Sequence, residues 1–385
     1  MPSEWVIEAL TKGLDFSLKR AERLSKTRSI RAMAYGELKY LVLRRDIGRY
    51  YEGTAIIKTD TEYKVIPGYP HMKRIVLAKR ALNHYFIDKI VVEEKMNGYN
   101  VRLFKIGDKI YAATRGGYIC PYTTHRIRRK YRENIQHLLS MLGESTIIVG
   151  EVVGLENPYI RYKYPEAPQW DIFIFDIFLG KNPLSANERV NLVSDCGLRN
   201  VRRLGVIWKH ESKKLFEIID ELEKEKREGV VLKDPFYRVE PLKYTTSYIN
   251  IDDISIGMRS PFDEGRYFVF PRLVRELFMY YERGYDSELI GNKALELGKA
   301  LINPALNSIK KYVKENGIGE TFELRFHNYS FLEDFIEYMF RLDVDFSVIS
   351  IEKKQSEIIF RGIKWMKETQ AQFERILKTG ISPMD

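Results

Sequence analysis

A lysine followed by a turn sequence is the feature of this chain that most clearly suggests covalent chemistry. Lys95 lies between two apolar runs, 90–92 and 101–104, each of which predicts a strand, and the Asn97-Gly98 pair between them is typical of a hairpin turn. The sequence therefore predicts a β-hairpin that holds the Lys95 amine at the end of a strand. Taken alone, the pattern fits a surface lysine beside a common turn equally well.

Several charged and aromatic side chains further along the chain would complete a binding site with Lys95. Glu151 and Glu228 lie in or beside apolar strand segments, where burial is costly unless a cation, a metal or a ligand hydroxyl meets the carboxylate. Phe175 offers a ring face on which a base could stack. Cations on neighbouring predicted strands would balance acids or bind phosphate: Arg115, Lys233 and Lys243. Together these residues predict a nucleoside triphosphate pocket with Lys95 as the nucleophile.

Length and composition indicate how many domains the chain has, what kind of partner it binds and in which cellular compartment it is found. At 385 residues the chain exceeds one compact core, so two or three domains are expected. A formal charge of +10 and a pI near 9.2 favour an anionic partner, most plausibly nucleic acid. Cys120 and Cys196 are too few for a disulfide framework or a cysteine zinc site, and the six histidines lack metal-ligand spacing. Without a run of ~18–20 apolar residues or a signal-peptide pattern, we expect a protein of the reducing cytoplasm that does not enter a membrane.

The predicted elements fall into three regions. The first, 1–70, begins with helix and continues into short strands, predicted at 38–43, 54–57 and 63–66. The second, 71–262, has one helix at 215–226 and is otherwise dominated by strands, predicted at 88–93, 99–105, 109–114, 146–153, 171–178, 229–233 and 241–244. The third, 263–385, has strands at 322–326 and 346–351 and helices at 273–283, 289–316, 331–342 and 363–377. Pro304 predicts a kink or a restart within the second of these helices.

The motifs around Lys95 resemble those of the covalent nucleotidyltransferase superfamily, which contains the ATP-dependent ligases and the mRNA capping enzymes. Lys95-Met96-Asn97-Gly98 is similar to its nucleophile motif, Thr114-Arg115-Gly116-Gly117 to its arginine motif, and Glu228-Gly229-Val230-Val231 to its metal-binding acidic motif. Within the superfamily the chain most resembles the archaeal ATP-dependent RNA ligases, which form homodimers. All the motifs occur in order across residues 94–243, which argues against a chance match.

The resemblance implies a role for each matching residue. Lys95 would be the nucleophile, and Lys243 would hold the α-phosphate. Glu228 would bind Mg²⁺ or Mn²⁺, and Glu94 would contact the adenine amino group, which makes ATP the expected cofactor. Nearby cations and the metal should lower the pKa of the Lys95 amine, since a free lysine is mostly protonated at neutral pH. The remaining nucleotide-binding residues would be Glu151 on the ribose, Phe175 on the base, and Asn100, Arg115 and Lys233.

The same resemblance implies the fold and the reaction. We expect an α+β fold in which an adenylyltransferase domain of ATP-grasp-like antiparallel sheets, 71–262, follows an N-terminal α/β domain, 1–70. A mostly helical or α+β domain, 263–385, would mediate dimerisation. The implied activity is RNA ligation: RNA 5′-phosphate and 3′-hydroxyl ends would be joined through lysyl-AMP and adenylylated RNA, and single-stranded RNA could be circularised.

Three departures from the family pattern bear on the substrate. Asn100 stands where DNA ligases and capping enzymes usually carry arginine, which favours RNA over DNA. Asn97 replaces the commoner aspartate, and Thr245 replaces a second lysine after Lys243. The alternatives are a DNA ligase, which would seal nicked duplexes, and a capping guanylyltransferase, which would be labelled by GTP. A non-catalytic RNA-binding relative would form no covalent AMP adduct.

Several residues also have a purely structural interpretation. Glu151 and Glu228 could be ordinary acids at a sheet edge, and Arg115 a turn residue. Phe175 could be core like Phe173, which shares its strand face by the two-residue period, but its position before Asp176 matches the family motif. The basic run at 125–132 could be a solvated helix face, although we favour a contact with RNA phosphates. Residues 199–203 are a weaker candidate of the same kind.

Overall fold

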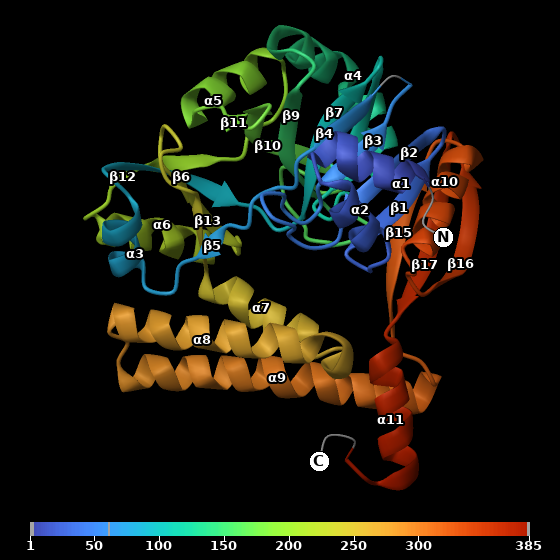
Figure 1. The fold of residues 1–385 in the computed structure, drawn as a ribbon. Coiled ribbons are helices and arrows are strands. Elements are labelled where there is room, and N and C mark those ends of the chain that lie inside the picture. The colour runs from blue at the N-terminus through green and yellow to red at the C-terminus, as the bar shows by residue number, and fades with distance from the viewer. Residues whose placement is uncertain (1–3, 61, 383–385) are drawn as a thin grey trace.

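The structure is a computed structural model that describes residues 4–60 and 62–382. Its central part consists of two five-stranded sheets, with a small four-stranded sheet and the three-stranded C-terminal sheet towards the right in Figure 1 and the long C-terminal helices below. This arrangement confirms the predicted α+β class with antiparallel sheets in the core. Among the described residues, no helix is long and apolar enough to cross a membrane.

The N-terminal sheet is covered on both faces. Its strands, in the order β1-β2-β3-β4, are all antiparallel: β1 Ile30–Tyr35, β2 Leu38–Leu43, β3 Ala55–Lys58 and β4 Tyr63–Ile66. Alternate residues of β2 point to opposite sides, so Leu41 and Leu43 pack against the preceding helical segments, α1 Glu4–Glu8, η1 Ala9–Gly13 and α2 Leu18–Ser25. Tyr40 and Val42 face the first of the two central sheets instead.

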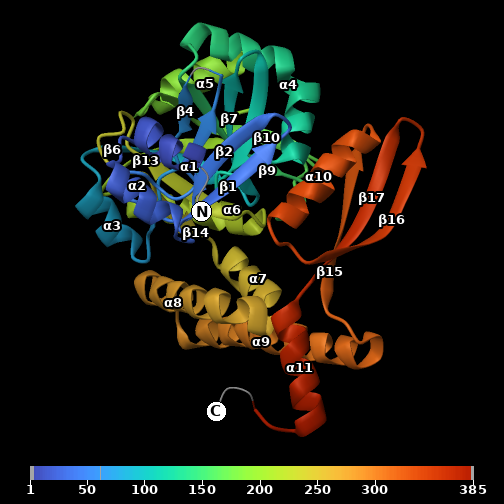
Figure 2. The ribbon, with the colours of Figure 1, turned by 45° about the vertical axis from the view of Figure 1, so that its right-hand side comes forward.

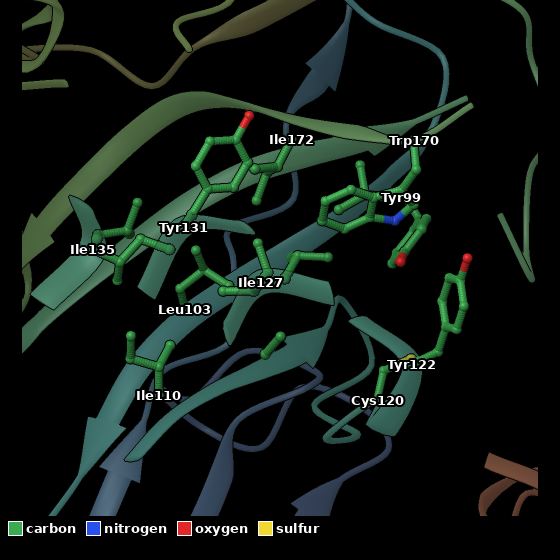
Figure 3. Close-up of a cluster of buried hydrophobic side chains, with 14 of the residues drawn as sticks. Tyr99, Leu103, Ile110, Cys120, Tyr122, Ile127, Tyr131, Ile135, Trp170 and Ile172 are labelled. Atoms are coloured by element: carbon green, nitrogen blue, oxygen red, sulfur yellow. The ribbon is translucent and has the colours of Figure 1, made fainter. Parts of the chain in front are cut away.

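The first central sheet has the order β11-β10-β9-β7-β8 and is antiparallel throughout. Its strands are β7 Tyr99–Ile106, β8 Lys109–Thr114, β9 Thr146–Val153, β10 Asp171–Leu179 and β11 Asn182–Pro183. Two helices, α4 Pro121–Leu142 and α5 Ala186–Asp195, cover one face. Ile127 and Ile135 of α4 pack there on Leu103 and Ile172 of the strands (Figure 3). The opposite faces of β7 and β9 therefore carry Asn100, Arg102 and Glu151 away from these helices.

The second central sheet has the order β12-β6-β13-β14-β5, in which only β14 and β5 are parallel. Its strands are β5 Lys73–Arg74, β6 Lys89–Lys95, β12 Arg203–Trp208, β13 Gly229–Lys233 and β14 Leu242–Thr245. Two helices, α3 Ala78–Tyr85 and α6 Ser212–Lys224, pack on Ile90, Val92, Val230 and Leu232. By the two-residue period, Lys95, Lys233 and Lys243 lie on the other face, which is turned away from these helices.

The C-terminal part combines long helices with a small sheet. The helical segments below the central sheets in Figure 1 are α7 Ser247–Gly257, η2 Pro261–Gly265, α8 Arg266–Arg283 and α9 Ser287–Glu315. The sheet has the order β15-β17-β16, with β15 Gly319–Phe326, β16 Phe346–Lys354 and β17 Glu357–Trp365, and is accompanied by α10 Tyr329–Arg341 and the final helix α11 Lys367–Thr379. Phe326 of β15 and Phe335 of α10 pack on Tyr122 of α4, which joins this sheet to the core (Figure 2).

Two sequence predictions about local structure are wrong. The predicted hairpin at Asn97-Gly98 does not form, because β6 and β7 belong to different sheets and the chain crosses between them there. Residues 363–365 end strand β17 and do not begin the last helix, which starts at Lys367. Of the two alternatives predicted at Pro304, the restart does not occur, because α9 continues through this residue. The elements that were not predicted are the helices α3, α5 and α7 and the strands β1, β5, β11, β12 and β17.

Candidate active site

A cavity of about 310 Å³ lies between the inner faces of the two central sheets. Glu94, Lys95, Lys233 and Lys243 line it from the second sheet. The other residues predicted to bind nucleotide line it from the first sheet and from the loop after β8: Asn100, Glu151, Phe175 and Arg115. Glu228 does not line the cavity but contacts Lys95 directly. The structure thus brings all the predicted site residues to one place.

Lys95 is the last residue of β6, and its amine meets a carboxylate. Lys95 Nζ lies 2.6 Å from Glu228 Oε1, and both side chains are largely buried. Backbone pairing places Gly229, the residue after Glu228, opposite Lys95. A Cβ at Gly98 would lie 2.1 Å from the carbonyl oxygen of Val152, so only glycine lets the chain pass this close to β9. At the Asn-Gly pair the chain therefore passes from the second central sheet to the first, and Lys95 precedes this crossing with its side chain in the cavity.

Asn100 and Glu151 face each other across β7 and β9. Burial raises the pKa of the Glu151 carboxyl to about 8, with a further contribution from Glu228, whereas the charge of Lys95 opposes the rise. The Asn100 side-chain oxygen is buried and accepts no hydrogen bond from the residues that the structure describes. A polar atom of this kind is costly unless a ligand donor reaches it, so Asn100 and Glu151 together suit a hydroxyl-bearing ligand.

Lys243 and Arg115 supply positive charge at the cavity. Burial lowers the pKa of Lys243 to about 8, and the cations of Arg74, Lys95 and Arg115 lower it further. Arg115 Nη2 is 2.9 Å from His71 Nδ1, and its side chain is otherwise exposed. Several cations that repel one another in a partly desolvated space create a strong preference for an anion such as a phosphate.

Lys233 is held differently, in a buried ion network that the sequence did not reveal. Its Nζ lies 2.8 Å from Glu93 Oε2 and 2.9 Å from Asp176 Oδ1, and all three side chains are only 1% exposed. Glu93 is also paired with Arg189, and Asp176 accepts a hydrogen bond from Tyr69 Oη at 2.6 Å. Because two carboxylates already neutralise the Lys233 ammonium, it should attract a phosphate less strongly than the ammonium of Lys243 does.

Glu94 lines the cavity and is paired with two arginines. Arg202 Nε is 3.1 Å from Glu94 Oε2, and Arg227 Nη1 is 3.3 Å from Glu94 Oε1. Burial raises the pKa of Glu94, and the two guanidinium groups counteract it. The sequence analysis did not predict that Arg227 pairs with Glu94. The one indication in the sequence is that Arg227 directly precedes the acidic motif at Glu228.

Phe175 and Phe173 lie on the same face of β10, but only Phe175 lines the cavity. Ile172, Ile174 and Ile177 pack beneath α4 and α5, so both phenylalanines lie on the opposite face, as the two-residue period predicts. The Phe175 ring packs edge-on against Tyr69 at 5.6 Å between centroids. Phe173 is buried among Met96, Val153 and Tyr164, and Phe175 packs against the same cluster. The pairing of β10 with β9 shifts register between Ile174 and Asp176, so the regular alternation is interrupted after Phe175.

A larger cavity of about 620 Å³ lies elsewhere, between the N-terminal sheet and the first central sheet. Its lining is mostly apolar and contains no residue predicted to bind nucleotide. The smaller cavity is the better candidate for the active site, because size alone does not supply the charged groups that bind a triphosphate.

The basic run at 125–132 lies on α4, where most of its side chains have partners within the chain. Arg126 pairs with Glu156, Arg128 donates to the carbonyl oxygen of Ile110, Arg129 contacts His327, and Lys130 pairs with Asp171. In the second basic segment, Arg199 and Arg202 are likewise paired, with Asp171 and Glu94. These contacts favour a structural role for both segments over the RNA contact that the sequence suggested.

Comparison with known proteins agrees with the geometry of the site. The RNA ligase family model matches residues 88–245, and the model of the ligase Pab1020 C-terminal region matches residues 256–380. An archaeal ATP-dependent RNA ligase, solved in two forms, superposes with a TM-score of 0.88 at 30% identity over 97% of this chain and 99% of that one. The chain belongs to the family of archaeal ATP-dependent RNA ligases. This confirms the resemblance and the enzyme class predicted from the motifs.

Two further relatives cover nearly the whole chain. An uncharacterised protein of Methanocaldococcus jannaschii is 35% identical over 369 residues, which span 94% of this chain and 91% of the relative. A putative ATP-dependent DNA ligase from Aquifex aeolicus superposes with a TM-score of 0.86 at 29% identity over 95% of this chain and 100% of that one. The shared architecture therefore includes the N-terminal and C-terminal parts as well as the motif-bearing core.

The donor set fits a divalent metal that is bound jointly by protein and substrate. Glu228 and Glu151 are close enough for the charge of one to raise the pKa of the other, and carboxylate oxygen is a ligand that Mg²⁺ and Mn²⁺ prefer. Within 4–60 and 62–382, no cluster of three or more Asp, Glu, His or Cys side chains could hold a metal by itself. Phosphate oxygens of a substrate would complete such a site.

Proposed function

We propose that this chain joins RNA 5′-phosphate and 3′-hydroxyl ends in three steps, using ATP. The observation that carries the proposal is the Lys95 amine in a cavity that also presents Lys243, Arg115, Glu151 and Asn100. An amine, a set of phosphate-binding cations and groups suited to ribose hydroxyls are what a covalent adenylyl transfer requires.

In the first step, the lone pair of Lys95 Nζ attacks the α-phosphorus of ATP, and the bond to the β-phosphate oxygen breaks to release pyrophosphate. Glu228 Oε1, at 2.6 Å from Lys95 Nζ, is placed to accept the proton that the lysine must lose. Lys243 holds the α-phosphate, Glu151 and Asn100 bind the ribose, Arg115 orients the substrate, and Phe175 stacks on the adenine. Glu94 contacts the adenine amino group, which selects ATP.

A divalent cation, Mg²⁺ or Mn²⁺, would neutralise charge on the phosphates and the leaving group, with Glu228 as its protein ligand. In the second step, an oxygen of the RNA 5′-phosphate attacks the lysyl-AMP phosphorus, which breaks the P–N bond and restores Lys95. In the third, the RNA 3′-hydroxyl attacks the activated 5′-phosphorus and AMP leaves. When both ends belong to one strand, the product is a circle.

The proposal predicts that a Lys95→Ala variant loses the first step of the reaction and keeps the last. Adenylylation of the protein should be lost, because the proposed nucleophile is removed, whereas pre-adenylylated RNA should still be sealed. Lys89→Ala is the matched control, since Lys89 is the exposed first residue of the same strand. Radiolabelled ATP, 5′-phosphorylated RNA and a DNA oligonucleotide of the same sequence would be incubated in parallel and the products resolved. Covalent AMP on the Lys95→Ala protein would contradict the assignment.

A DNA ligase is the second candidate, and the Aquifex aeolicus match is the observation that favours it. Sealing of nicked duplex DNA with no product on single-stranded RNA would replace the RNA proposal and keep Lys95 as nucleophile. GTP labelling would point to a capping guanylyltransferase. If neither protein-AMP nor a ligated product forms, the chain is a non-catalytic RNA-binding relative.

We also propose that the chain acts in the cytoplasm as a homodimer through α8 and α9. These helices expose large apolar side chains, including Phe270 at 69%, Tyr281 at 79% and Val313 at 67%. Several large exposed apolar side chains on two neighbouring helices are consistent with coverage by a partner, and a second copy is the occupant that the family resemblance favours. Sedimentation at micromolar concentration should show a dimer that Val313→Glu weakens; a monomeric wild-type chain would refute it.

A further inference from the structure

Two arginines without carboxylate partners donate hydrogen bonds to the same small polar network near Lys243. Arg74 of β5 donates from Nη1 to Thr245 Oγ1 at 3.2 Å, and Arg275 of α8 donates from Nη1 to Asn250 Oδ1 at 3.3 Å. In the part of the chain that the structure describes, neither guanidinium forms an ion pair. Arg272, one turn earlier on α8, differs in this respect, because it pairs with Asp253 at 2.8 Å.

The network between the two arginines is buried and internally fixed. Thr245 Oγ1 donates to Asn250 Oδ1 at 3.1 Å, and Asn250 Nδ2 donates to Glu276 Oε1 at 2.7 Å. The side chains of Thr245, Asn250 and Glu276 are all at least nine-tenths buried. Arg74 and Arg275 are therefore held at defined positions by a rigid frame, and are not mobile surface cations.

This frame adjoins Lys243, which lines the cavity described above. Thr245 follows Lys243 by two residues on β14, so both side chains lie on the same face of the strand. The backbone of Arg74 pairs with that of Lys243. Burial lowers the pKa of Arg275 to about 10, and the charges of Arg74 and Arg272 lower it further, whereas Asp253 and then Glu228 raise it. The two arginines thus act electrostatically on each other and lie within the field of Glu228.

The position of Thr245 also explains a departure noted in the sequence. Thr245 stands where DNA ligases carry a second lysine after the one that corresponds to Lys243. In the structure its hydroxyl accepts a hydrogen bond from Arg74, which brings a guanidinium to the end of β14 from a distant part of the chain. The missing cation of the motif is therefore replaced by one from β5.

We propose that Arg74 and Arg275 form a phosphate-binding subsite beside Lys243, to which α8 of the C-terminal part contributes directly. A guanidinium fork binds phosphate oxygens in a bidentate manner, and a desolvated arginine without a carboxylate partner gains most from such a ligand. The proposal rests on the function proposed above, which supplies two phosphate groups: the β- and γ-phosphates of ATP and the 5′-phosphate of the RNA.

The test separates the three steps in single-turnover measurements on the full-length protein. Arg74→Met, Arg275→Met and Arg275→Lys would be compared with Arg283→Met, which removes an arginine from the same helix that pairs with Asp220 away from the network. Protein-AMP formation is measured against ATP concentration, RNA adenylylation with isolated protein-AMP and a 5′-phosphorylated oligonucleotide, and sealing with pre-adenylylated RNA. Circular dichroism and melting temperature verify folding.

The step that fails identifies the phosphate. If the subsite holds the ATP phosphates, the Met variants raise the KM for ATP about tenfold or more, the effect of one charge-assisted hydrogen bond, and leave RNA adenylylation unchanged. If it holds the RNA 5′-phosphate, only RNA adenylylation slows. Arg275→Lys should recover part of the loss. Unchanged rates in the first two steps, or an equal loss in all three, would overturn the proposal. A wild-type chain that forms no protein-AMP would instead refute the proposed function.

Discussion

Replacing Glu151 by glutamine should stabilise the ligand-free protein by an amount that depends on pH. The pKa of the Glu151 carboxyl is raised from 4.5 to about 8, chiefly by burial. Between these values the folded protein keeps a proton that the unfolded chain releases, so the free energy of unfolding of the wild type falls as the pH rises through this window. The glutamine of Glu151→Gln does not titrate. The free energy of unfolding of the variant should therefore exceed that of the wild type by an amount that grows from pH 4.5 to 8 and then remains constant.

The size of the effect follows from the same values. A pKa that is about 3.5 higher in the folded state corresponds to at most ~5 kcal/mol of unfolding free energy, at about 1.4 kcal/mol per pH unit. Glu151 is only partly buried, so solvent screening reduces the expected effect to about 2–3 kcal/mol. For a chain of 385 residues this is a difference of roughly 2–4 °C in melting temperature.

The assay is thermal unfolding of the ligand-free protein between pH 5 and pH 9, roughly the range in which the carboxyl titrates. Glu240→Gln is the control, because Glu240 is an exposed acid outside the cavity. The reasoning would be refuted by a Glu151→Gln advantage that stays constant or shrinks as the pH rises. Such a result would mean that the attraction of Lys95 outweighs burial and keeps Glu151 ionised at neutral pH.

Three other substitutions probe the architecture of the site. Lys233→Met leaves Glu93 and Asp176 buried without their shared cation and should lower the free energy of unfolding by about 3–5 kcal/mol. Urea denaturation measures this, and an unchanged midpoint would contradict it. Gly98→Ala places a methyl group 2.1 Å from the Val152 carbonyl oxygen and should slow protein-AMP formation about 10²-fold by displacing Lys95. Gly298→Ala, which meets open space, is its control, and equal rates for both would be evidence against the crossing argument. Phe175→Ala should raise the KM for ATP about tenfold with little change in melting temperature, because this ring lines the cavity. Phe173→Ala should mainly lower the melting temperature, because this ring is buried in the core. If Phe173→Ala raised the KM and Phe175→Ala did not, Phe173 would be the base-stacking residue.

Most residues that line the cavity could be predicted from the sequence because they lie within local patterns. Glu151 interrupts an apolar strand, Lys95 ends β6 and Lys243 lies within β14, and the alternation around each of them is regular, so the face on which each side chain lies follows from its neighbours. The crossing after Lys95 could not be predicted. Asn-Gly signals a tight turn, but whether the next strand pairs with the previous one depends on the Gly98 contact with β9, which lies more than 50 residues away.

Residues that act through distant partners also remained hidden. Arg74 and Arg275 come from segments about 200 residues apart, and neither lies in a recognisable motif. The same holds for the buried network of Lys233, in which Glu93, Asp176 and Arg189 belong to three different elements. Periodicity identifies the face on which such a residue lies, but not the residue that it meets. The strand β17 was missed for a related reason, since its pairing with both β15 and β16 stabilises residues 363–365 as strand.

The N-terminal part is an integral component of the active site, because it fixes the loop that carries Arg115. The guanidinium of Arg102, 1% exposed, donates to the carbonyl oxygens of Thr114 at 2.8 Å, Arg115 at 3.3 Å and Gly53 at 2.9 Å, and also to that of Pro67. A Cβ at Gly53 would lie 2.0 Å from the Arg115 carbonyl oxygen, so the two loops are in direct backbone contact. A shift of the N-terminal sheet therefore has to move Arg115 relative to Lys95. The position of Arg115 in the cavity thus depends on backbone contacts between the β8 loop and the N-terminal part.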